Sequence, residues 1–291
     1  MIQYDPHHWR SHLFDIRGSM LREIFSRVAV CVTWSLAVVA WHRMGLAPAI
    51  NIPLHGHTLT GVALGLLLVF RTNVSYERFW EGRRQWGNIV NDCRNLARLS
   101  CSLLKSDPEL LSLWLHWTMV FPWSVMNRLR GKKKLGPITT GLPLVDIEAT
   151  ENAQHVPLAV SRRMTEQLSL AQQRGLISDI QQITLDGGIQ RLMDSLGACE
   201  RIHNTPLPFA YMVHLRRALI CYLLTLPMAL VTDFGWLTIP ATLLIAYVLL
   251  GIEEIGVEIE DPFGDDENDL PLQSLCETIE NNLRELLPVR K

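Results

Sequence analysis

Four uncharged apolar segments stand out along the chain, separated by stretches of mixed polarity. They are residues 28–41, 59–70, 218–231 and 234–252. A helix needs roughly 17 to 25 residues to cross the hydrocarbon core of a bilayer, and flanking arginines extend a shorter run because their side chains reach the interface. The pattern therefore predicts four membrane helices, at about residues 26–44, 57–71, 216–232 and 234–253.

The remaining segments, residues 72–212 and 254–291, have the apolar spacing that is typical of water-facing helices. The predicted fold class is all-α, a membrane protein with four transmembrane helices and a helical cytosolic part, forming one unit over residues 1–291. A soluble all-α protein with unusually apolar core helices is the alternative.

Two breaks are predicted within the cytosolic part. Thr72 and Asn73 follow the charge at the end of the second membrane segment and indicate a short polar turn. Residues 177–185 indicate a short helix with a cap near Ser178 or Asp179, and Asp186 is positioned to cap a separate helix after it.

Basic residues border the membrane segments mainly on one side, although Arg43 follows the first segment at its other end. Arg27, Arg71 and Arg216 lie at ends that would face the same side, whereas residues 45–57 and the short loop at Asp233 contain no lysine or arginine. Short cytoplasmic loops carry the excess of basic residues in membrane proteins. We therefore expect a multi-pass protein of the cell (inner) membrane with both termini in the cytoplasm.

Composition supports this reading. Hydrophobic residues make up 48% of 291 residues, mean hydropathy is +0.13 and the net charge is -2. No basic excess indicates a nucleic-acid partner. The six cysteines form no C-x-x-C pair, which is typical of buried thiols in a reducing compartment.

One helical face of the second membrane segment has two interpretations. Val62, Leu66 and Phe70 recur every four residues and share a face, and Gly61 and Gly65 beside it have the small-residue spacing that lets membrane helices approach closely. Several copies around an axis would form apolar rings, which gate ions by dewetting. An ordinary core helix would show the same side chains.

Three segments resemble the motifs of the bestrophin family and occur in the family's order. They are residues 71–83 (RTNVSYERFWEGR), 200–209 (ERIHNTPLPF) and 260–272 (EDPFGDDENDLPL). By this resemblance, which spans most of the chain, the protein is identified as a member of that family, similar to its bacterial branch. The resemblance implies a homopentameric ion channel in the lipid bilayer, with one continuous pore on the axis.

The resemblance also implies which residues line the pore. Val62, Leu66 and Phe70 match the family's narrow neck, and Ile180 matches its cytosolic aperture. Five copies of Asp179 would place carboxylates near the exit and attract cations. We therefore expect conduction of monovalent cations such as Na⁺. A chloride channel of the same architecture is the alternative, and a non-conducting membrane scaffold is the second alternative.

The acidic segment 253–272 is a candidate metal site. Dense carboxylates in a flexible loop suit Ca²⁺, although the EF-hand register is absent, and a solvated loop that caps neighbouring helices is the alternative. The resemblance implies a family Ca²⁺ clasp with Asp261, Asp266 and Asp269 as ligands, but residues 267–268 interrupt its run of aspartates. A structural role for the segment is the other reading, and no cofactor is required.

An enzyme is the remaining class to weigh. Its candidates are histidines at positions 7, 8, 12, 55 and 57, and His8 and His12 share a helix face that suits Zn²⁺. No H-E-x-x-H motif, nucleophile elbow or phosphate loop accompanies them. We therefore expect no enzymatic activity.

Overall fold

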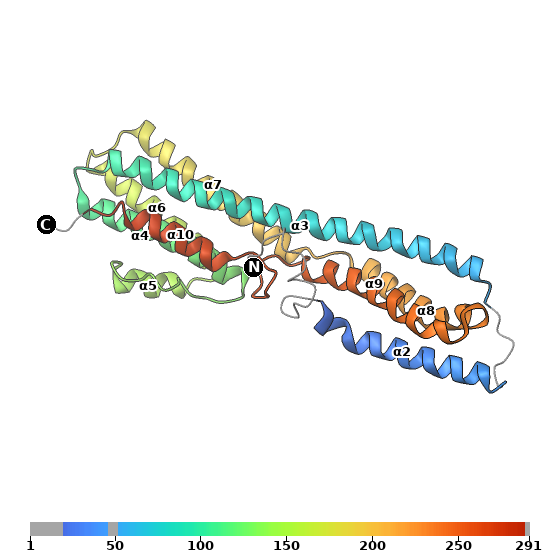
Figure 1. Ribbon diagram of the computed structural model, residues 1–291. Helices are drawn as coiled ribbons and strands as arrows, with labels where there is room; N and C mark the ends of the chain where they lie inside the picture. The colour runs from blue at the N-terminus through green and yellow to red at the C-terminus, as the bar shows by residue number, and fades with distance from the viewer. Residues whose placement is uncertain (1–19, 46–51, 289–291) are drawn as a thin grey trace. The chain divides into compact units, whose positions relative to one another are not determined.

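The computed structural model describes residues 20–45 and 52–288, and all regular secondary structure in these ranges is helical. The α-helices, labelled as in Figure 1, are α2 (Leu21–Arg43), α3 (Leu54–Leu103), α4 (Pro108–Leu129), α5 (Leu144–Glu151), α6 (Val156–Gln173), α7 (Asp179–Asn204), α8 (Phe209–Phe234), α9 (Thr238–Glu258) and α10 (Leu272–Arg284). A short 3₁₀ helix, η1 (Gly235–Leu237), joins α8 to α9.

The chain forms two compact units. Among the described residues, one unit, which we call the membrane unit, comprises 20–45, 52–79 and 206–261. The other, which we call the tryptophan-rich unit, comprises 80–205 and 262–288. Helix α3 begins in the first unit and ends in the second.

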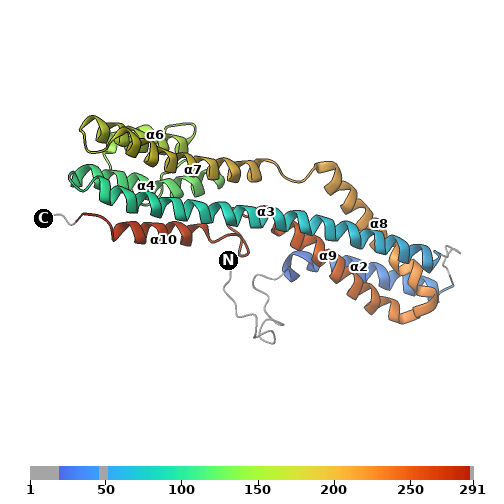
Figure 2. The same ribbon diagram turned by 90° about the horizontal axis from the view of Figure 1, so that it is seen from above.

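The membrane unit packs α2, α8, α9 and the first part of α3 side by side (Figures 1 and 2). Its buried core is almost entirely aliphatic, drawn from Ile24, Leu64, Leu68, Leu219, Leu223, Ala246 and Leu250. Three stretches are long and apolar enough to cross a membrane: Leu21–Arg43, Leu54–Leu103 and Phe209–Glu258. The last stretch contains α8 and α9, so the four predicted membrane segments fall within these three stretches.

The tryptophan-rich unit is organised around α4. Asp107 caps this helix by accepting a hydrogen bond from the Leu110 N–H at 3.0 Å, and Pro108 occupies its first turn, where a missing N–H costs nothing. Trp114, Trp117 and most other side chains of α4 are buried. A helix that is apolar on all sides forms the centre of a core, and α6, α7 and α10 pack around this one (Figure 2).

Neither predicted break within the cytosolic part exists. Thr72 lies inside α3, where its hydroxyl donates to the Leu68 carbonyl at 2.9 Å instead of ending the helix. Asp186 lies inside α7, which runs unbroken from the predicted cap at Ser178. Gly188, two residues after Asp186, makes a close helix contact: a Cβ there would lie 2.5 Å from the Leu96 side chain of α3, so a larger residue would force Leu96 to shift.

Candidate pore-lining site

Helix α3 has two contrasting apolar faces within the membrane unit. Leu64 and Leu68 are 3% and 1% exposed and belong to the core. Val62, Leu66 and Phe70 are 59%, 56% and 62% exposed, although they are equally apolar. An exposed apolar stripe of this kind requires a cover of lipid, of another chain or of a narrow pore.

The small residues beside this stripe differ in what they contact. A Cβ on Gly61 would lie 2.7 Å from the Tyr222 hydroxyl of α8, so Gly61 permits a close approach within the subunit. The same ring of Tyr222 stacks on His57, with centroids 4.2 Å apart. Gly65 has no atom within 4 Å of such a Cβ, so the predicted small-residue packing occurs at Gly61 alone within the subunit.

A network of charged side chains lies immediately after the stripe. Arg71 of α3 donates from Nη1 to Oε1 of Glu253 on α9 at 2.8 Å, and both side chains are almost completely buried. Arg216 of α8 donates from Nε to the same oxygen at 3.1 Å. Arg27 of α2 reaches Glu253 at 3.4 Å and Glu254 at 2.6 Å. One carboxylate therefore joins all four helices of the membrane unit.

Arg71 lies against α9 beside Gly256, where a Cβ would be 3.5 Å from the Arg71 Nε, an ordinary contact distance. Within the described part of the chain, the Nε and Nη2 of Arg71 have no hydrogen-bond partner. In the sequence, these charges mark only the ends of the apolar segments. Opposite charges at the edges of separate membrane segments were the available signal of a buried network.

The predicted aperture residues begin α7. Ile180 is 78% exposed, and Ile183 one turn later is also exposed. Asp179 is the first residue of the helix, after the Ser178 cap. Its carboxylate accepts a hydrogen bond from Gln172 Nε2 at 3.1 Å, so it has a local partner as well as a favourable place at a helix N-terminus.

The acidic loop is closed by contacts within the tryptophan-rich unit. Arg130 donates from Nη2 to the Gly264 carbonyl at 2.8 Å and forms an ion pair with Asp265 at 2.7 Å. Asp269 is 4% exposed and accepts the Asp266 N–H at 2.7 Å. Its oxygen would lie 2.6 Å from a Cβ on Gly264, so the buried carboxylate fills the space beside that glycine.

The three family-like motifs contact one another: residues 71–83 and 200–209 each contact residues 260–272. In the tryptophan-rich unit, a Cβ on Gly82 would lie 3.0 Å from the ring of Phe263, which is fully buried. In the membrane unit, Arg78 donates to the Glu260 carbonyl at 3.1 Å, and the Glu260 carboxylate accepts the Leu207 N–H at 3.0 Å. The three motifs are thus contact surfaces of the fold.

Metal and nucleophile candidates are sparse. Residues 20–45 and 52–288 contain no group of three histidine, cysteine or acidic side chains that would hold a metal ion, and the histidines at positions 7, 8 and 12 lie outside these ranges. Burial raises the pKa of Cys199 to about 12 and raises the pKa values of Cys93 and Cys276 as well. These thiols remain protonated at neutral pH and are poor ligands and nucleophiles.

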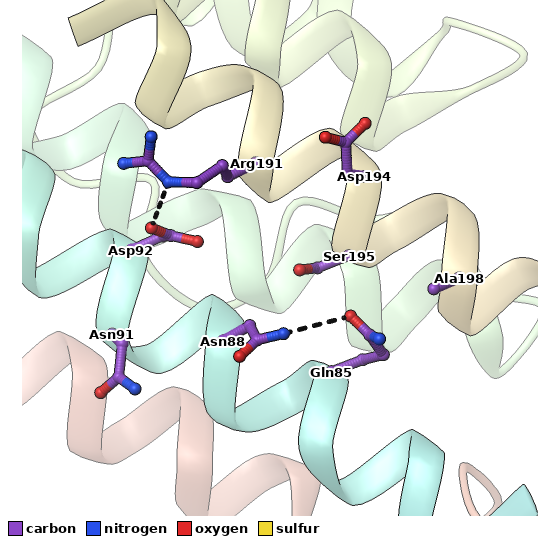
Figure 3. A pocket seen from close by; sticks show the side chains of 8 residues that line it. All are labelled: Gln85, Asn88, Asn91, Asp92, Arg191, Asp194, Ser195 and Ala198. Carbon is purple, nitrogen blue, oxygen red and sulfur yellow. Dashed lines mark hydrogen bonds and ion pairs between the residues drawn. The ribbon is translucent and has the colours of Figure 1, made fainter. Parts of the chain in front are cut away.

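A polar groove of about 480 Å³ lies between α3 and α7 in the tryptophan-rich unit (Figure 3). Asp92 of α3 accepts from the Nε of Arg191 of α7 at 2.9 Å, and Ser195 points from α7 toward α3. Asn88 donates to Gln85 at 3.4 Å on the α3 side. The groove holds paired charges and amides and was not predicted from the sequence.

Known proteins match the chain over almost its whole length. The family model of the bacterial/fungal bestrophin protein matches residues 1–285. A Synechocystis protein named as a voltage-dependent anion channel-forming protein is 37% identical over 97% of this chain and 92% of its own length. The Escherichia coli K12 protein YneE, which has the same descriptive name, is 30% identical over 98% of this chain and 94% of its own.

A solved structure agrees with the fold. The bacterial bestrophin homologue from Klebsiella pneumoniae superposes with a TM-score of 0.84 at 29% identity, over 91% of this chain and 98% of that one. The names of the two relatives refer to anions, whereas the expectation from the sequence was cation conduction.

The three long apolar stretches and the relatives agree on a multi-pass protein of a bacterial membrane. The matched family forms channels, so the protein is not an enzyme. On its sequence, its helical fold and the contacts of its three motifs, the chain belongs to the bacterial branch of the bestrophin family.

Proposed function

We propose that the chain assembles as a homopentamer that conducts small anions such as chloride through a pore on the five-fold axis. The observation that carries this proposal is the exposed apolar stripe of α3, with Val62, Leu66 and Phe70 opposite the buried Leu64 and Leu68. Five such helices around an axis cover the stripe and produce three apolar rings. A constriction of this kind opposes ion passage when it dewets and permits passage when it is hydrated.

Ile180 is proposed as the second constriction. Its side chain is 78% exposed at the beginning of α7, as a residue that projects into a pore would be in one isolated subunit. Asp179 beside it has a lesser role in this proposal, because its carboxylate accepts from Gln172 and stabilises the helix N-terminus. Because the Asp179 carboxylate is bonded to Gln172, it gives little support for cation conduction. The names of the relatives refer to anions.

The acidic loop is assigned a structural role. Asp269 accepts a backbone N–H within the loop, and Arg130 holds the loop through the Gly264 carbonyl and Asp265. These contacts close the loop using the protein's own groups. Ca²⁺ binding by Asp261, Asp266 and Asp269 would have to compete with them, so we expect chelation by EGTA to leave both the folding and the currents unchanged.

Ion replacement with the purified full-length protein in planar bilayers tests the proposal. Replacing chloride by gluconate should abolish most of the current, whereas replacing sodium by N-methyl-D-glucamine should leave it. Currents that follow sodium instead would establish the cation reading. Silence from protein that has the mass of a pentamer would favour the non-conducting scaffold.

The stripe itself is tested by the triple variant V62A/L66A/F70A, which should increase single-channel conductance or make the channel leaky because the rings widen. Alanine at Leu144 and Val145, two exposed apolar residues of α5, is the matched control. Unchanged conductance in the triple variant would remove the stripe from the pore.

A further inference from the structure

Apolar rings do not select between anions and cations, so the sign of the permeant ion must be set by charge elsewhere. We propose that Arg71 biases the pore toward anions, acting as the positive end of a buried dipole whose negative end, Glu253, is held on α9. This inference rests on the proposed function, because it requires that the exposed stripe of α3 face the axis.

Arg71 lies at the level of the last apolar ring. It follows Phe70 directly, so its Cα lies about 1.5 Å further along the axis of α3. Its side chain is fully buried and runs from α3 to α9, where Nη1 meets Glu253 Oε1 at 2.8 Å. The charge is therefore fixed in place beside the constriction.

The ion pair of Arg71 and Glu253 has a fixed direction, from α3 to α9. The guanidinium belongs to α3, the helix with the exposed stripe, whereas the carboxylate belongs to α9. If α3 faces the axis, each of the five subunits points the positive end of this pair toward the pore. Buried charges are screened little by salt, and low-dielectric walls focus their field into the opening.

The network has more positive than negative groups. Three guanidinium groups (Arg27, Arg71 and Arg216) face two carboxylates (Glu253 and Glu254), which leaves one net positive charge per subunit. Within the described residues, the Nε and Nη2 of Arg71 are buried without a hydrogen-bond partner. The carboxylates therefore do not neutralise the network, and its least solvated charge is the one on α3.

The expected size of the effect is measurable. Five unit charges about 10 Å from an ion, in high dielectric with physiological screening, change the ratio of chloride to sodium permeability by about three- to tenfold.

The test is the permeability ratio, obtained from reversal potentials of the full-length pentamer in a NaCl gradient. Arg71→Gln should lower the chloride-to-sodium ratio about three- to tenfold, and Glu253→Gln should raise it. The double variant Arg71→Gln with Glu253→Gln removes both ends of the pair, so it avoids an unpaired buried charge and should fold even where Arg71→Gln does not. Because the two changes have opposite effects on the ratio, the double variant should still lower it, but by less than Arg71→Gln alone.

Arg216→Gln is the matched control. Arg216 donates to the same Glu253 oxygen and loses the same charge, but its side chain is 53% exposed and lies on α8, so it should shift the ratio much less. A wild-type ratio in the double variant, or an equal shift from Arg216→Gln, would overturn the role of Arg71. A wild-type channel that selects cations would refute the proposed function alone, provided that the Arg71 and Glu253 variants still shift the ratio in opposite directions.

Discussion

The two compact units place charged and apolar side chains in opposite ways. In the membrane unit, Arg71 and Glu253 are buried while Val62 and Phe70 are exposed. In the tryptophan-rich unit the apolar side chains of α4 are buried, and the ion pair of Arg128 with Glu200 remains partly exposed.

The contrast follows from the medium that each unit is suited to. Lipid solvates an exposed apolar side chain at no cost, but it does not solvate a charge, so the charges of the membrane unit pair with each other in the interior. Water solvates charges well but apolar side chains poorly, and the tryptophan-rich unit therefore buries its large apolar side chains around α4. The unit in which a side chain lies decides whether its exposure is a defect, a lipid contact or a pore wall.

The largest effect is expected from removing the buried carboxylate of the membrane unit. Glu253→Ala leaves Arg71 buried without a counter-charge and should reduce the free energy of unfolding by about 3–5 kcal/mol, or prevent assembly. Glu254→Ala removes a carboxylate whose partner, Arg27, is 48% exposed, and should cost about 0–1 kcal/mol. Denaturant unfolding in detergent measures both, and equal losses would contradict the special place of Glu253.

The two faces of α3 give the next largest difference. Leu68→Ala deletes a fully buried side chain and should cost about 2–5 kcal/mol of stability. Leu66→Ala, two residues earlier on the exposed face, should change stability by no more than about 0.5 kcal/mol. Its effect should appear in single-channel conductance instead. A large stability loss from Leu66→Ala would mean that this face is a packing surface and not a pore wall.

A smaller effect is expected at the acidic loop of the tryptophan-rich unit. Arg130→Ala removes a charged donor to the Gly264 carbonyl and should cost about 1.5–3 kcal/mol. Arg128→Ala, in the last turn of α4 two residues earlier, loses a partly exposed pair with Glu200 and should cost about 0–1 kcal/mol. Thermal unfolding ranks the two, and the reverse order would show that the loop does not depend on Arg130.

The smallest expected effect is at the predicted aperture. Asp179→Asn removes one charge from each subunit, but the carboxylate already has a local partner in Gln172 and a helix N-terminus to stabilise. The permeability ratio should stay at its wild-type value while stability falls slightly. A shift of the ratio toward anions would restore Asp179 as a determinant of the ion's sign.

Local patterns predicted much of this fold. The apolar segments became α2, the start of α3, α8 and α9, and Ser178 caps α7 as its hydroxyl and spacing suggest. The breaks at Thr72 and Asp186 were wrong because a hydroxyl bond to the preceding turn and a tight contact at Gly188 keep these residues helical. The contact of Gly188 with Leu96 depends on how α7 packs on α3, which the local sequence does not reveal. The Thr72 hydroxyl can bond within a helix or in a turn, and the local sequence does not decide between the two.

The site was predicted less completely than the fold. The spacing of Val62, Leu66 and Phe70 identified one face of a helix, and that face is exposed in the subunit. The neighbouring network was missed because its members are far apart in the sequence, at positions 27, 71, 216 and 253, and each resembles an ordinary helix boundary. Only packing of the four helices brings them to one carboxylate.

The reversal potential of the wild-type protein in a NaCl gradient tests the central claim most directly. An anion-conducting pore should give a potential close to the chloride equilibrium potential, in both directions of the gradient. A potential close to the sodium equilibrium potential would contradict the account, because the pore would then prefer cations despite the positive charge proposed for Arg71 beside its neck.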